Sequence, residues 1–248
     1  MFDLRIDAGL ARLNLDRPEA RNAIPLKGWT ELADTAARAV AGGARLLILE
    51  TAPGCAFCAG ADIGDFHAFR DDADARTHFR RAMRHGLDAL RNLDIPVIAV
   101  VDGACYGAGV ALAIACDVRF AGPSATFAIT PAKLGISYPQ EDIHRLVSLV
   151  GPGQAARLLL GAQRIDGAEA ARIGLVERFA ETDLAAEIAE FARCVTANAP
   201  ESLAMLKRGL ALAARNVAQD EGQDRGFDDL LGSELLAEKI LPFRRREA

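Results

Sequence analysis

The sequence contains no apolar stretch that is long enough to cross a membrane. Of its 248 residues, 51% are hydrophobic, but no uninterrupted apolar run reaches the ~18 to 20 residues that a membrane-spanning helix needs. Residues 1–9 also lack the basic start and the apolar segment of a secretory signal. We therefore expect a cytoplasmic protein without a membrane partner, and its apolar content is sufficient for a sizeable core.

The sequence also lacks a basic segment of the kind that binds nucleic acid. It has 29 Lys and Arg residues against 34 Asp and Glu residues, for a net charge of −5, and the basic residues are spread along the chain. Nucleic acid is therefore excluded as the main partner. The exception is the terminal run Arg244, Arg245 and Arg246, which we expect to be a solvated tail rather than a phosphate or RNA contact.

Cysteine and histidine are too few and too scattered for a metal site. The five cysteines form an odd, widely spaced set, and we expect them to be reduced: Cys55, Cys58, Cys105, Cys116 and Cys194. Cys55 and Cys58 have the CxxC spacing of a redox pair or half a zinc site. Neither a second such pair nor clustered histidines complete the set, so we interpret both as incidental thiols and predict no metal.

Apolar periodicity predicts alternating strands and helices over the first 130 residues. The expected elements are a hairpin over 4–15, a helix over 25–40, a strand over 45–49, a helix over 75–92, a strand over 97–101, a helix over 107–115 and strands over 117–120 and 126–129. The run 97–101 is apolar on both faces, as expected of a strand between two layers. This order predicts an α/β fold with a layered or spiral core.

The remaining residues change to a helical pattern. Helices are expected over 154–160, 167–173, 184–195 and 202–213. We divide the chain into a core of residues 1–195 and a C-terminal helical region of residues 196–248. Helices that follow an α/β core often pack outward as a trimerising or lid-forming layer, and we expect such a role here.

Two loops that follow strands consist mostly of small residues, and they are candidates for a ligand-binding site. They are residues 58–62, after the strand at 45–49, and residues 103–109, after the strand at 97–101. Small side chains let a ligand reach the backbone N–H groups, and the second loop opens a buried helix whose N-terminus favours an anion. Two such amides on one oxygen form an oxyanion hole, which stabilises an enolate or a tetrahedral species by ~3 to 4 kcal/mol per donor. The alternative is a pair of tight turns that merely need glycine.

At this point the chain resembles the crotonase (enoyl-CoA hydratase/isomerase) superfamily. The similar stretches, in the family's order and spacing across nearly the whole chain, are residues 17–23 (RPEARNA), 57–63 (FCAGADI), 96–103 (PVIAVVDG), 113–119 (AIACDVR) and 173–176 (IGLV). The resemblance implies a spiral of ββα turns followed by a helical region, assembled as homotrimers or dimers of trimers.

The resemblance also implies a substrate and its contacts. The substrate is an acyl-CoA thioester, whose carbonyl accepts hydrogen bonds from the backbone N–H groups of Ala61 and Ala108, and coenzyme A enters as part of the substrate rather than as a separate cofactor. Residues 61–64 are expected along the thioester and pantetheine arm, and residues 22–24 near the CoA end. The residues expected to contact CoA or substrate are Asn22, Ala23, Ile24, Ala59, Gly60, Asp62, Ile63, Gly64 and Gly107.

The chain departs from the family at the two glutamates that hydratases use to add water. The corresponding positions are Ala111 and Ala132. Alanine cannot give or take a proton, so the general acid and base of hydration are missing. The pattern therefore favours isomerisation, which needs one proton shuttle, over hydration. Another alternative is a non-catalytic protein that only binds acyl-CoA.

Candidate proton-transfer residues gather in residues 134–146. This segment is similar to methylmalonyl-CoA decarboxylases, which carry a tyrosine at the place of Tyr138 but a histidine at the place of Ala61. Decarboxylation is therefore an alternative reaction, in which the Tyr138 hydroxyl orients the carboxylate or protonates the product. Glu141 and Asp142 are the competing candidates for a base. They follow Pro139 in the first turn of a helix, where acidic residues also simply satisfy free amides and the helix dipole.

Overall fold

The computed structural model describes residues 1–244 and separates into two units, Met1–Thr196 and a C-terminal unit that begins at Ala197. Of the terminal arginines, Arg245 and Arg246 lie outside the described residues. No helix of the described chain combines the length and the apolar character that a membrane crossing requires.

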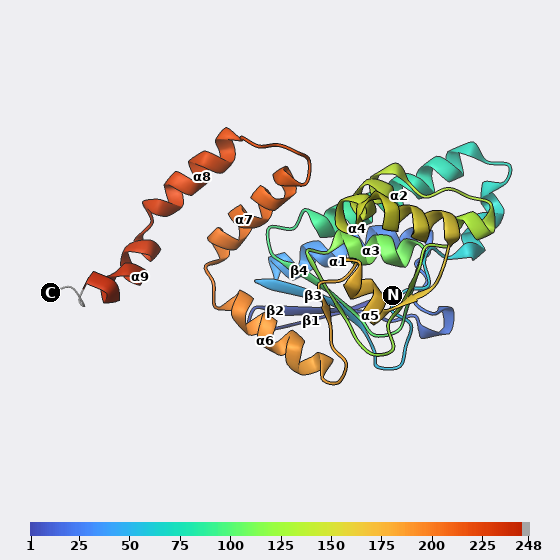
Figure 1. Cartoon of the computed structure of the whole chain (residues 1–248). Coiled ribbons are helices and arrows are strands. Elements are labelled where there is room, and N and C mark those ends of the chain that lie inside the picture. Colours follow the sequence, from blue (N-terminus) through green and yellow to red (C-terminus); the bar gives the residue numbers. More distant parts are fainter. Residues whose placement is uncertain (245–248) are drawn as a thin grey trace. The chain divides into compact units, whose positions relative to one another are not determined.

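A six-stranded sheet organises the N-terminal unit, in the order β1-β2-β3-β4-β6-β9 (Figure 1). Its strands are β1 (Phe2–Asp7), β2 (Leu10–Leu15), β3 (Leu46–Thr51), β4 (Val97–Val101), β6 (Val118–Ala121) and β9 (Arg178–Phe179). The predicted hairpin is confirmed, because β1 and β2 pair antiparallel around the positive φ angles of Ala8 and Gly9. All later neighbours in this sheet pair in parallel.

Three short strands form a second sheet, in the order β5-β7-β8. They are β5 (Ala104–Tyr106), β7 (Thr126–Ala128) and β8 (Ile165–Asp166). We expected residues 103–109 to be entirely loop, and this was wrong for β5. Three residues are too few to show a strand period, and they become a strand because their backbone pairs with β7 on one side and with Cys58 on the other.

Helices cover both faces of the larger sheet. They are α1 (Leu26–Ala41), α2 (Ala73–Arg91), α3 (Ala108–Ala115), α4 (Gln140–Gly161), α5 (Gly167–Arg172) and α6 (Leu184–Thr196), with 3₁₀ helices η1 (Pro18–Ala20), η2 (Ile63–Phe69) and η3 (Pro131–Leu134). Helices α1 and α2 lie on the face opposite α6 (Figure 1), whose Phe191 ring packs 5.6 Å from that of Phe120 in β6. These helices confirm the predicted α/β core.

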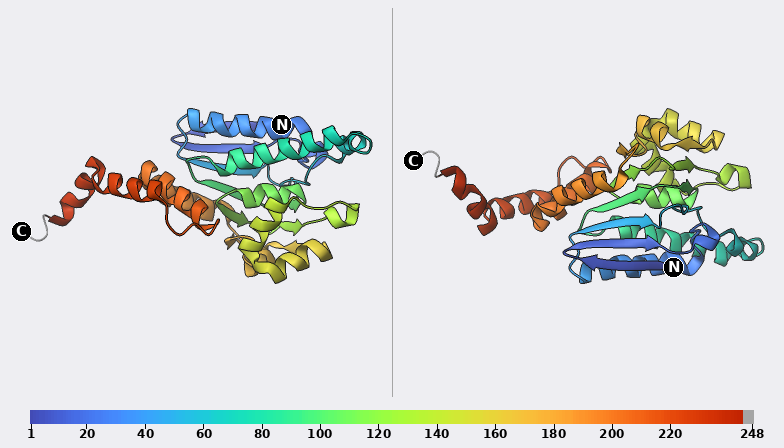
Figure 2. Two further views of the ribbon diagram at one scale, coloured as in Figure 1. Left: turned by 90° about the horizontal axis from the view of Figure 1, so that it is seen from above. Right: turned by 90° about the horizontal axis from the view of Figure 1, so that it is seen from below.

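Chain order follows position across the N-terminal unit. In the views of Figure 2, the elements run from the blue hairpin and α1 at one edge, through the green β4 and α3, to the yellow end of α4 at the other. Helix α3 is buried all round, from Gly109 to Ala115. The predicted helix over 154–160 is the last part of α4, which changes direction at Gly151 (φ 74°) ahead of Pro152. Because β3, β4 and α3 lie in the middle of this order, the loops 58–62 and 103–109 that follow β3 and β4 meet near the middle of the unit.

The C-terminal unit contains α7 (Pro200–Ala213), α8 (Glu221–Leu231) and α9 (Glu234–Arg244). Helices α7 and α8 are tied together by the Arg208–Asp220 ion pair at 2.7 Å and by a hydrogen bond from Gln223 Nε2 to the Met205 carbonyl oxygen at 3.0 Å. Large apolar side chains remain exposed on this unit, including Leu206 and Phe227. The expected helix over 202–213 is present, whereas α8 and α9 were not among the predicted elements.

Candidate active site

The two small-residue loops lie against one another and are joined by backbone hydrogen bonds. The Cys58 N–H donates to the Ala104 carbonyl oxygen at 3.0 Å, and the Tyr106 N–H donates to the Cys58 carbonyl oxygen at 2.8 Å. The contact is close because Gly109, in the first turn of α3, has no side chain. A Cβ atom there would lie 2.3 Å from the Cys58 carbonyl oxygen. The start of α3 is thereby held against the first loop.

Gly60 brings the first loop to the amide that opens α3. It has φ +114°, and a Cβ atom on it would lie 3.0 Å from the Tyr106 carbonyl oxygen and 3.4 Å from the Ala108 amide nitrogen. Only glycine combines this backbone angle with this approach at little cost. Ala61, the next residue, therefore lies close to Ala108.

The N–H groups of Ala61 and Ala108 have no hydrogen-bond acceptor among the described residues. At Ala61, the backbone bridge to Ile24 uses the neighbouring groups, the Gly60 carbonyl and the Asp62 amide, at 2.8 and 2.9 Å. In a parallel bridge of this kind the N–H of the middle residue faces away from the partner. Ala108 is the first residue of α3, where an amide has no acceptor within the helix.

Both amides belong to residues that line the same cavity, which has a volume of about 770 Å³. The two loops contribute Ala59, Gly60, Ala61, Gly107 and Ala108 to its wall. Five of the residues expected to bind the thioester are thus brought together. This arrangement has the features of an anion-binding site made of backbone, with two donors that have no acceptor among the described residues.

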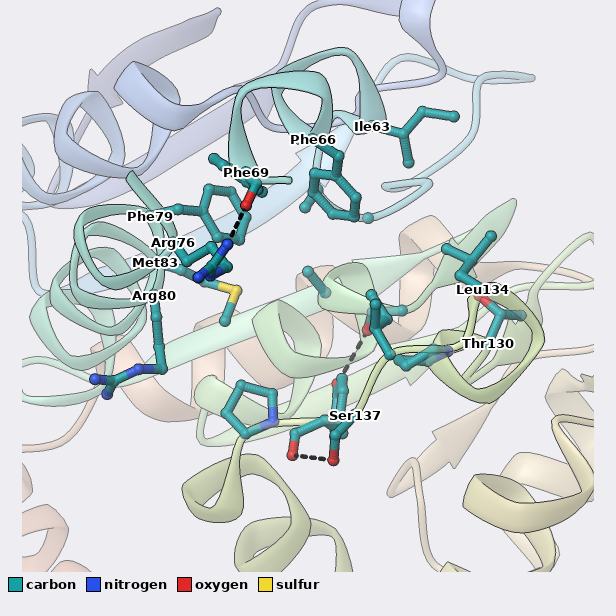
Figure 3. A pocket seen from close by; sticks show the side chains of 18 of the residues that line it. Ile63, Phe66, Phe69, Arg76, Phe79, Arg80, Met83, Thr130, Leu134 and Ser137 are labelled. Carbon is teal, nitrogen blue, oxygen red and sulfur yellow. Dashed lines mark hydrogen bonds between the residues drawn. The ribbon is translucent and has the colours of Figure 1, made fainter. Parts of the chain in front are cut away.

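The rest of the cavity wall is mainly apolar and comes from two segments (Figure 3). From η2 and α2 come Ile63, Phe66, Phe69, Phe79 and Met83, and from the segment after β7 come Leu134 and Ile136. The three phenylalanine rings pack on one another with centroids 5.0 to 5.8 Å apart. Sequence reasoning missed this cluster, because only the helical spacing of Phe79 and Met83 was visible, and that spacing is as typical of an ordinary core.

The charged residues on the cavity wall are three arginines. They are Arg70, Arg76 and Arg80, and Arg76 is fixed by Nη1 hydrogen bonds to the carbonyl oxygens of Phe69 and Arg70. Among the described lining residues there is neither a carboxylate nor a histidine. These charges favour an anionic ligand, and the described wall carries no conventional general base.

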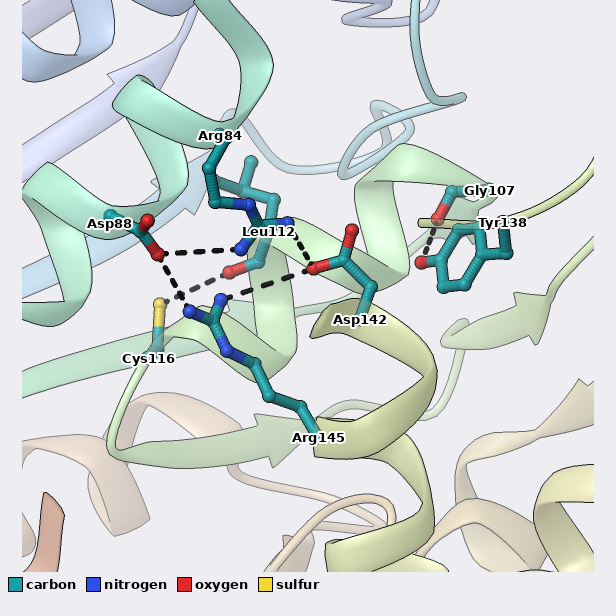
Figure 4. A network of polar contacts seen from close by, with 8 residues as sticks. All are labelled: Arg84, Asp88, Gly107, Leu112, Cys116, Tyr138, Asp142 and Arg145. Carbon is teal, nitrogen blue, oxygen red and sulfur yellow. Dashed lines mark hydrogen bonds and ion pairs between the residues drawn. The ribbon is translucent and has the colours of Figure 1, made fainter. Parts of the chain in front are cut away.

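Tyr138 is the one candidate proton-transfer residue that lines the described cavity. Its ring is buried, and its hydroxyl donates a hydrogen bond to the Gly107 carbonyl oxygen at 3.0 Å (Figure 4). Burial, helped by the nearby Asp142 charge, raises the pKa of this phenol well above its ordinary value. The hydroxyl therefore keeps its proton at neutral pH.

Asp142 lies in an ion-pair network beside the cavity rather than on its described wall. The carboxylate is fully buried, and Oδ1 accepts from Arg84 Nη2 at 2.6 Å and faces Arg145 Nη1 at 3.9 Å (Figure 4). Both arginines also pair with Asp88. Burial raises the Asp142 pKa, and the two arginines oppose that rise. Glu141 is exposed and is likewise outside the described wall.

Several residues expected near CoA brace the first loop instead of lining the described cavity. The Asn22 side chain is buried and bonds the Arg17 N–H, the Thr51 hydroxyl and the Ala56 carbonyl oxygen at 2.7 to 2.8 Å. Asp62 pairs with Arg17 at 2.6 Å, and its other oxygen accepts from the Gly64 N–H at 2.9 Å. Ile63 is on the cavity wall, whereas the contacts of residues 22–24, Asp62 and Gly64 with CoA stay predictions.

Neither the cysteines nor the two substituted positions add ionisable chemistry to the cavity. All five cysteines are free, and burial raises the pKa of the Cys58 thiol to about 12. Within residues 1–244 no three His, Cys, Asp or Glu side chains form a group that could hold a metal ion. Ala111 is buried in α3 and Ala132 is exposed on η3, and both are absent from the described cavity wall.

Comparison with known proteins identifies the family of the chain. The sequence model described as enoyl-CoA hydratase/isomerase matches residues 5–231. The probable enoyl-CoA hydratase echA6 of Mycobacterium bovis is 36% identical over 182 residues, 73% of this chain and 72% of its own length. A peroxisomal Delta(3,5)-Delta(2,4)-dienoyl-CoA isomerase of Arabidopsis thaliana is 28% identical over 88% of this chain and 82% of its own.

The fold is also that of solved structures of this kind. The crystal structure of an enoyl-CoA hydratase/carnithine racemase from Magnetospirillum magneticum superposes with a TM-score of 0.92, at 29% sequence identity, over 99% of this chain and 92% of that one. The predicted crotonase-like fold is thereby confirmed.

Proposed function

Because this chain belongs to the enoyl-CoA hydratase/isomerase family, we propose that it binds an acyl-CoA thioester and stabilises the enolate of that thioester on the N–H groups of Ala61 and Ala108. The observation that carries the proposal is the pair of unused amides on the wall of one cavity, brought together by Gly60. Each donor of such a pair contributes about 3 to 4 kcal/mol to the stability of the transition state. Coenzyme A is part of the substrate, and the proposal needs no separate cofactor.

The acyl group occupies the apolar part of the cavity. The phenylalanine cluster of η2 and α2 provides a wall for a hydrocarbon chain next to the amide pair. The CoA arm extends along residues 61–64, toward residues 22–24. The bracing of this segment by the Arg17–Asp62 ion pair at 2.6 Å supports a fixed path for the arm.

Hydration and isomerisation both require a base, whereas decarboxylation does not, and this difference separates the candidate reactions. With alanine at positions 111 and 132, hydration lacks its acid and base. Isomerisation, which the sequence favours, needs one residue that removes a proton from the substrate. Tyr138 keeps its proton, and Asp142 is held by arginines. The described cavity wall therefore supplies no free base for isomerisation.

Decarboxylation of a malonyl-type thioester is the reaction that this wall favours. When carbon dioxide leaves, the electron pair of the broken carbon–carbon bond becomes the enolate, so no proton is removed. Water that enters the cavity then protonates the product carbon. The three arginines on the wall support this candidate, because they attract the substrate carboxylate.

A substrate comparison separates the candidates. The purified protein is incubated with methylmalonyl-CoA, a 3-enoyl-CoA and a 2-enoyl-CoA, and the products are followed by mass spectrometry. Loss of carbon dioxide from methylmalonyl-CoA alone supports decarboxylation. Isomerised 3-enoyl-CoA with unchanged methylmalonyl-CoA overturns it in favour of isomerisation. Binding of all three without turnover contradicts the enolate proposal and leaves a non-catalytic acyl-CoA-binding protein.

We also propose that the chain assembles as a homotrimer or a dimer of trimers through its C-terminal unit. The exposed Leu206, Leu210 and Phe227 support this proposal, since side chains of this size are usually buried in an assembly. The molar mass of the purified protein, measured by light scattering, tests this proposal. A monomer at micromolar concentration contradicts it.

A further inference from the structure

The hydrogen bond of Tyr138 ends on the same peptide group that carries the proposed oxyanion donor. Its hydroxyl lies 3.0 Å from the Gly107 carbonyl oxygen, and that carbonyl is bonded to the Ala108 nitrogen. We propose that Tyr138 is a positioning residue that orients and polarises the Gly107–Ala108 peptide, so that the Ala108 N–H becomes a stronger donor to the thioester oxygen. The inference rests on the proposed function of that N–H.

Polarisation follows from the chemistry of the amide group. A donor on the carbonyl oxygen shifts electron density from nitrogen to oxygen, which makes the N–H more positive. Hydrogen bonds coupled in this way strengthen one another by roughly 10 to 30% per bond. The effect is largest where water is excluded, and the Tyr138 ring is buried.

Orientation follows from the backbone around Gly107. This residue has φ 51° and ψ −118°, a conformation that residues with a side chain disfavour. Rotation about its ψ angle would turn the Ala108 N–H away from the cavity. On one side, the Gly107 N–H is tied to the Ala128 carbonyl oxygen at 2.9 Å. On the other, the Gly107 carbonyl accepts from the N–H groups of Val110 and Ala111, at 3.0 and 3.4 Å, as well as from Tyr138. Among the described residues, Tyr138 supplies the side-chain hydrogen bond to this peptide.

The same contact argues against an acid or base role for Tyr138. A hydroxyl whose proton is donated to a carbonyl oxygen is not a base. Asp142, with its Oδ2 unpaired among the described residues, lies next to the phenol and disfavours its ionised form. Tyr138 therefore acts through Ala108 and not on the reacting carbon.

The test reads the polarisation of the thioester itself. Hexanoyl-CoA labelled with carbon-13 at the carbonyl has neither a carboxylate nor a double bond, so it binds without reacting. Isotope-edited infrared spectroscopy compares its carbonyl stretch in water and in the protein. Wild type is expected to shift the stretch to lower frequency. Tyr138→Phe should reduce that shift by roughly 5 to 15%, because only one of the two hydrogen bonds is strengthened by 10 to 30%, and should change affinity less than threefold.

The chain provides a matched control and a second variant. It contains only two tyrosines, and the other, Tyr106, bonds the Thr126 hydroxyl at 3.0 Å rather than the Gly107 carbonyl. Tyr106→Phe should leave the carbonyl stretch unchanged. In that background, 3-fluorotyrosine labels residue 138 alone, and its more acidic hydroxyl should lower the stretch further while the ring and the bond remain.

The outcomes are distinct. Opposite shifts from Tyr138→Phe and from fluorotyrosine support the inference. A stretch that is the same in wild type, Tyr138→Phe and the fluorinated protein overturns it and leaves the proposed function intact. A wild-type protein that binds hexanoyl-CoA without lowering the stretch overturns the oxyanion proposal itself, and the role of Tyr138 with it.

Discussion

Gly60 lies against Ala108 so closely that a Cβ atom on Gly60 would be 3.4 Å from the Ala108 amide nitrogen. The two residues come from loops that follow different strands, β3 and β4, and are 48 positions apart in the sequence. Their contact makes one site out of two turns. It also argues against the alternative that the glycines serve only local chain reversal, because local reversal does not require one loop to approach the other.

Replacing Gly60 should therefore damage catalysis more than folding. In Gly60→Ala the new methyl group would lie 3.0 Å from the Tyr106 carbonyl oxygen, so the two amides would separate. We expect kcat/KM to fall by about 10²-fold or more, the effect of losing one oxyanion donor. Gly43→Ala is the matched control. Its φ of +81° would also be strained for alanine, but a Cβ atom there meets open space. Equal activity of the two variants would contradict the role of Gly60.

Neutralising Asp142 should cost stability rather than chemistry. Asp142→Asn removes the buried partner of Arg84 and Arg145, and breaking a buried ion pair costs about 3 kcal/mol or more of unfolding free energy. Urea denaturation measures this loss. Glu141→Gln, at the exposed neighbour, should change stability by less than about 0.5 kcal/mol. A stable Asp142→Asn protein without activity would instead identify Asp142 as the base.

The Arg17–Asp62 ion pair predicts a pH-dependent contribution to stability. The hydrogen bond from Arg17 lowers the Asp62 pKa from its ordinary 3.8, so the folded state favours the ionised carboxylate. The resulting stabilisation is fully present above the unfolded pKa and is lost as the pH falls through the lower folded pKa. Asp62→Asn should therefore be less stable than wild type at pH 7, and the difference should shrink below about pH 3.8.

Thermal melts of both proteins across this range make the comparison, with Arg17→Met as the control that removes the partner instead. A difference between wild type and Asp62→Asn that grows on acidification would refute the assignment.

An arginine on the cavity wall should discriminate between charged and neutral acyl groups. Arg80 is exposed and has no hydrogen-bond or ion-pair partner within residues 1–244. Arg80→Gln should raise the KM for methylmalonyl-CoA by roughly two- to fivefold, the size of a solvent-exposed ion pair. It should leave the Kd of propionyl-CoA, which has no carboxylate on its acyl group, unchanged. Arg81→Gln, one residue on and outside the described wall, should alter neither. Equal losses for both ligands would assign Arg80 to the CoA phosphates.

The sequence predicted the parts of the fold that depend on local pattern. Apolar periodicity located the hairpin and the helices α1 and α2. Strand β4 was located because its run is apolar throughout, as is typical of a strand buried on both faces. Strands β5, β8 and β9 and helices α8 and α9 were missed. Three residues are too few to show a strand period. Helix α8 is short and rich in acidic residues, and none of its residues is buried.

The site was predictable where it consists of backbone and unpredictable where it consists of long-range pairs. Runs of small residues marked both loops, since only such runs expose amides to a ligand. The pairing of Asp142 with Arg84 joins residues 58 positions apart, and no local spacing indicates it. The same holds for Tyr138 and Gly107, so the hydroxyl that the sequence suggests for proton transfer is bonded to the peptide of the proposed donor.

The most direct measurement is a crystal structure of the protein with a bound, unreactive acyl-CoA such as hexanoyl-CoA. The account predicts that the thioester carbonyl oxygen lies about 2.7 to 3.1 Å from both the Ala61 and the Ala108 nitrogen, with the acyl chain against the phenylalanine cluster. A thioester oxygen that contacts neither amide, or that binds elsewhere with the amides still unpaired, would contradict it.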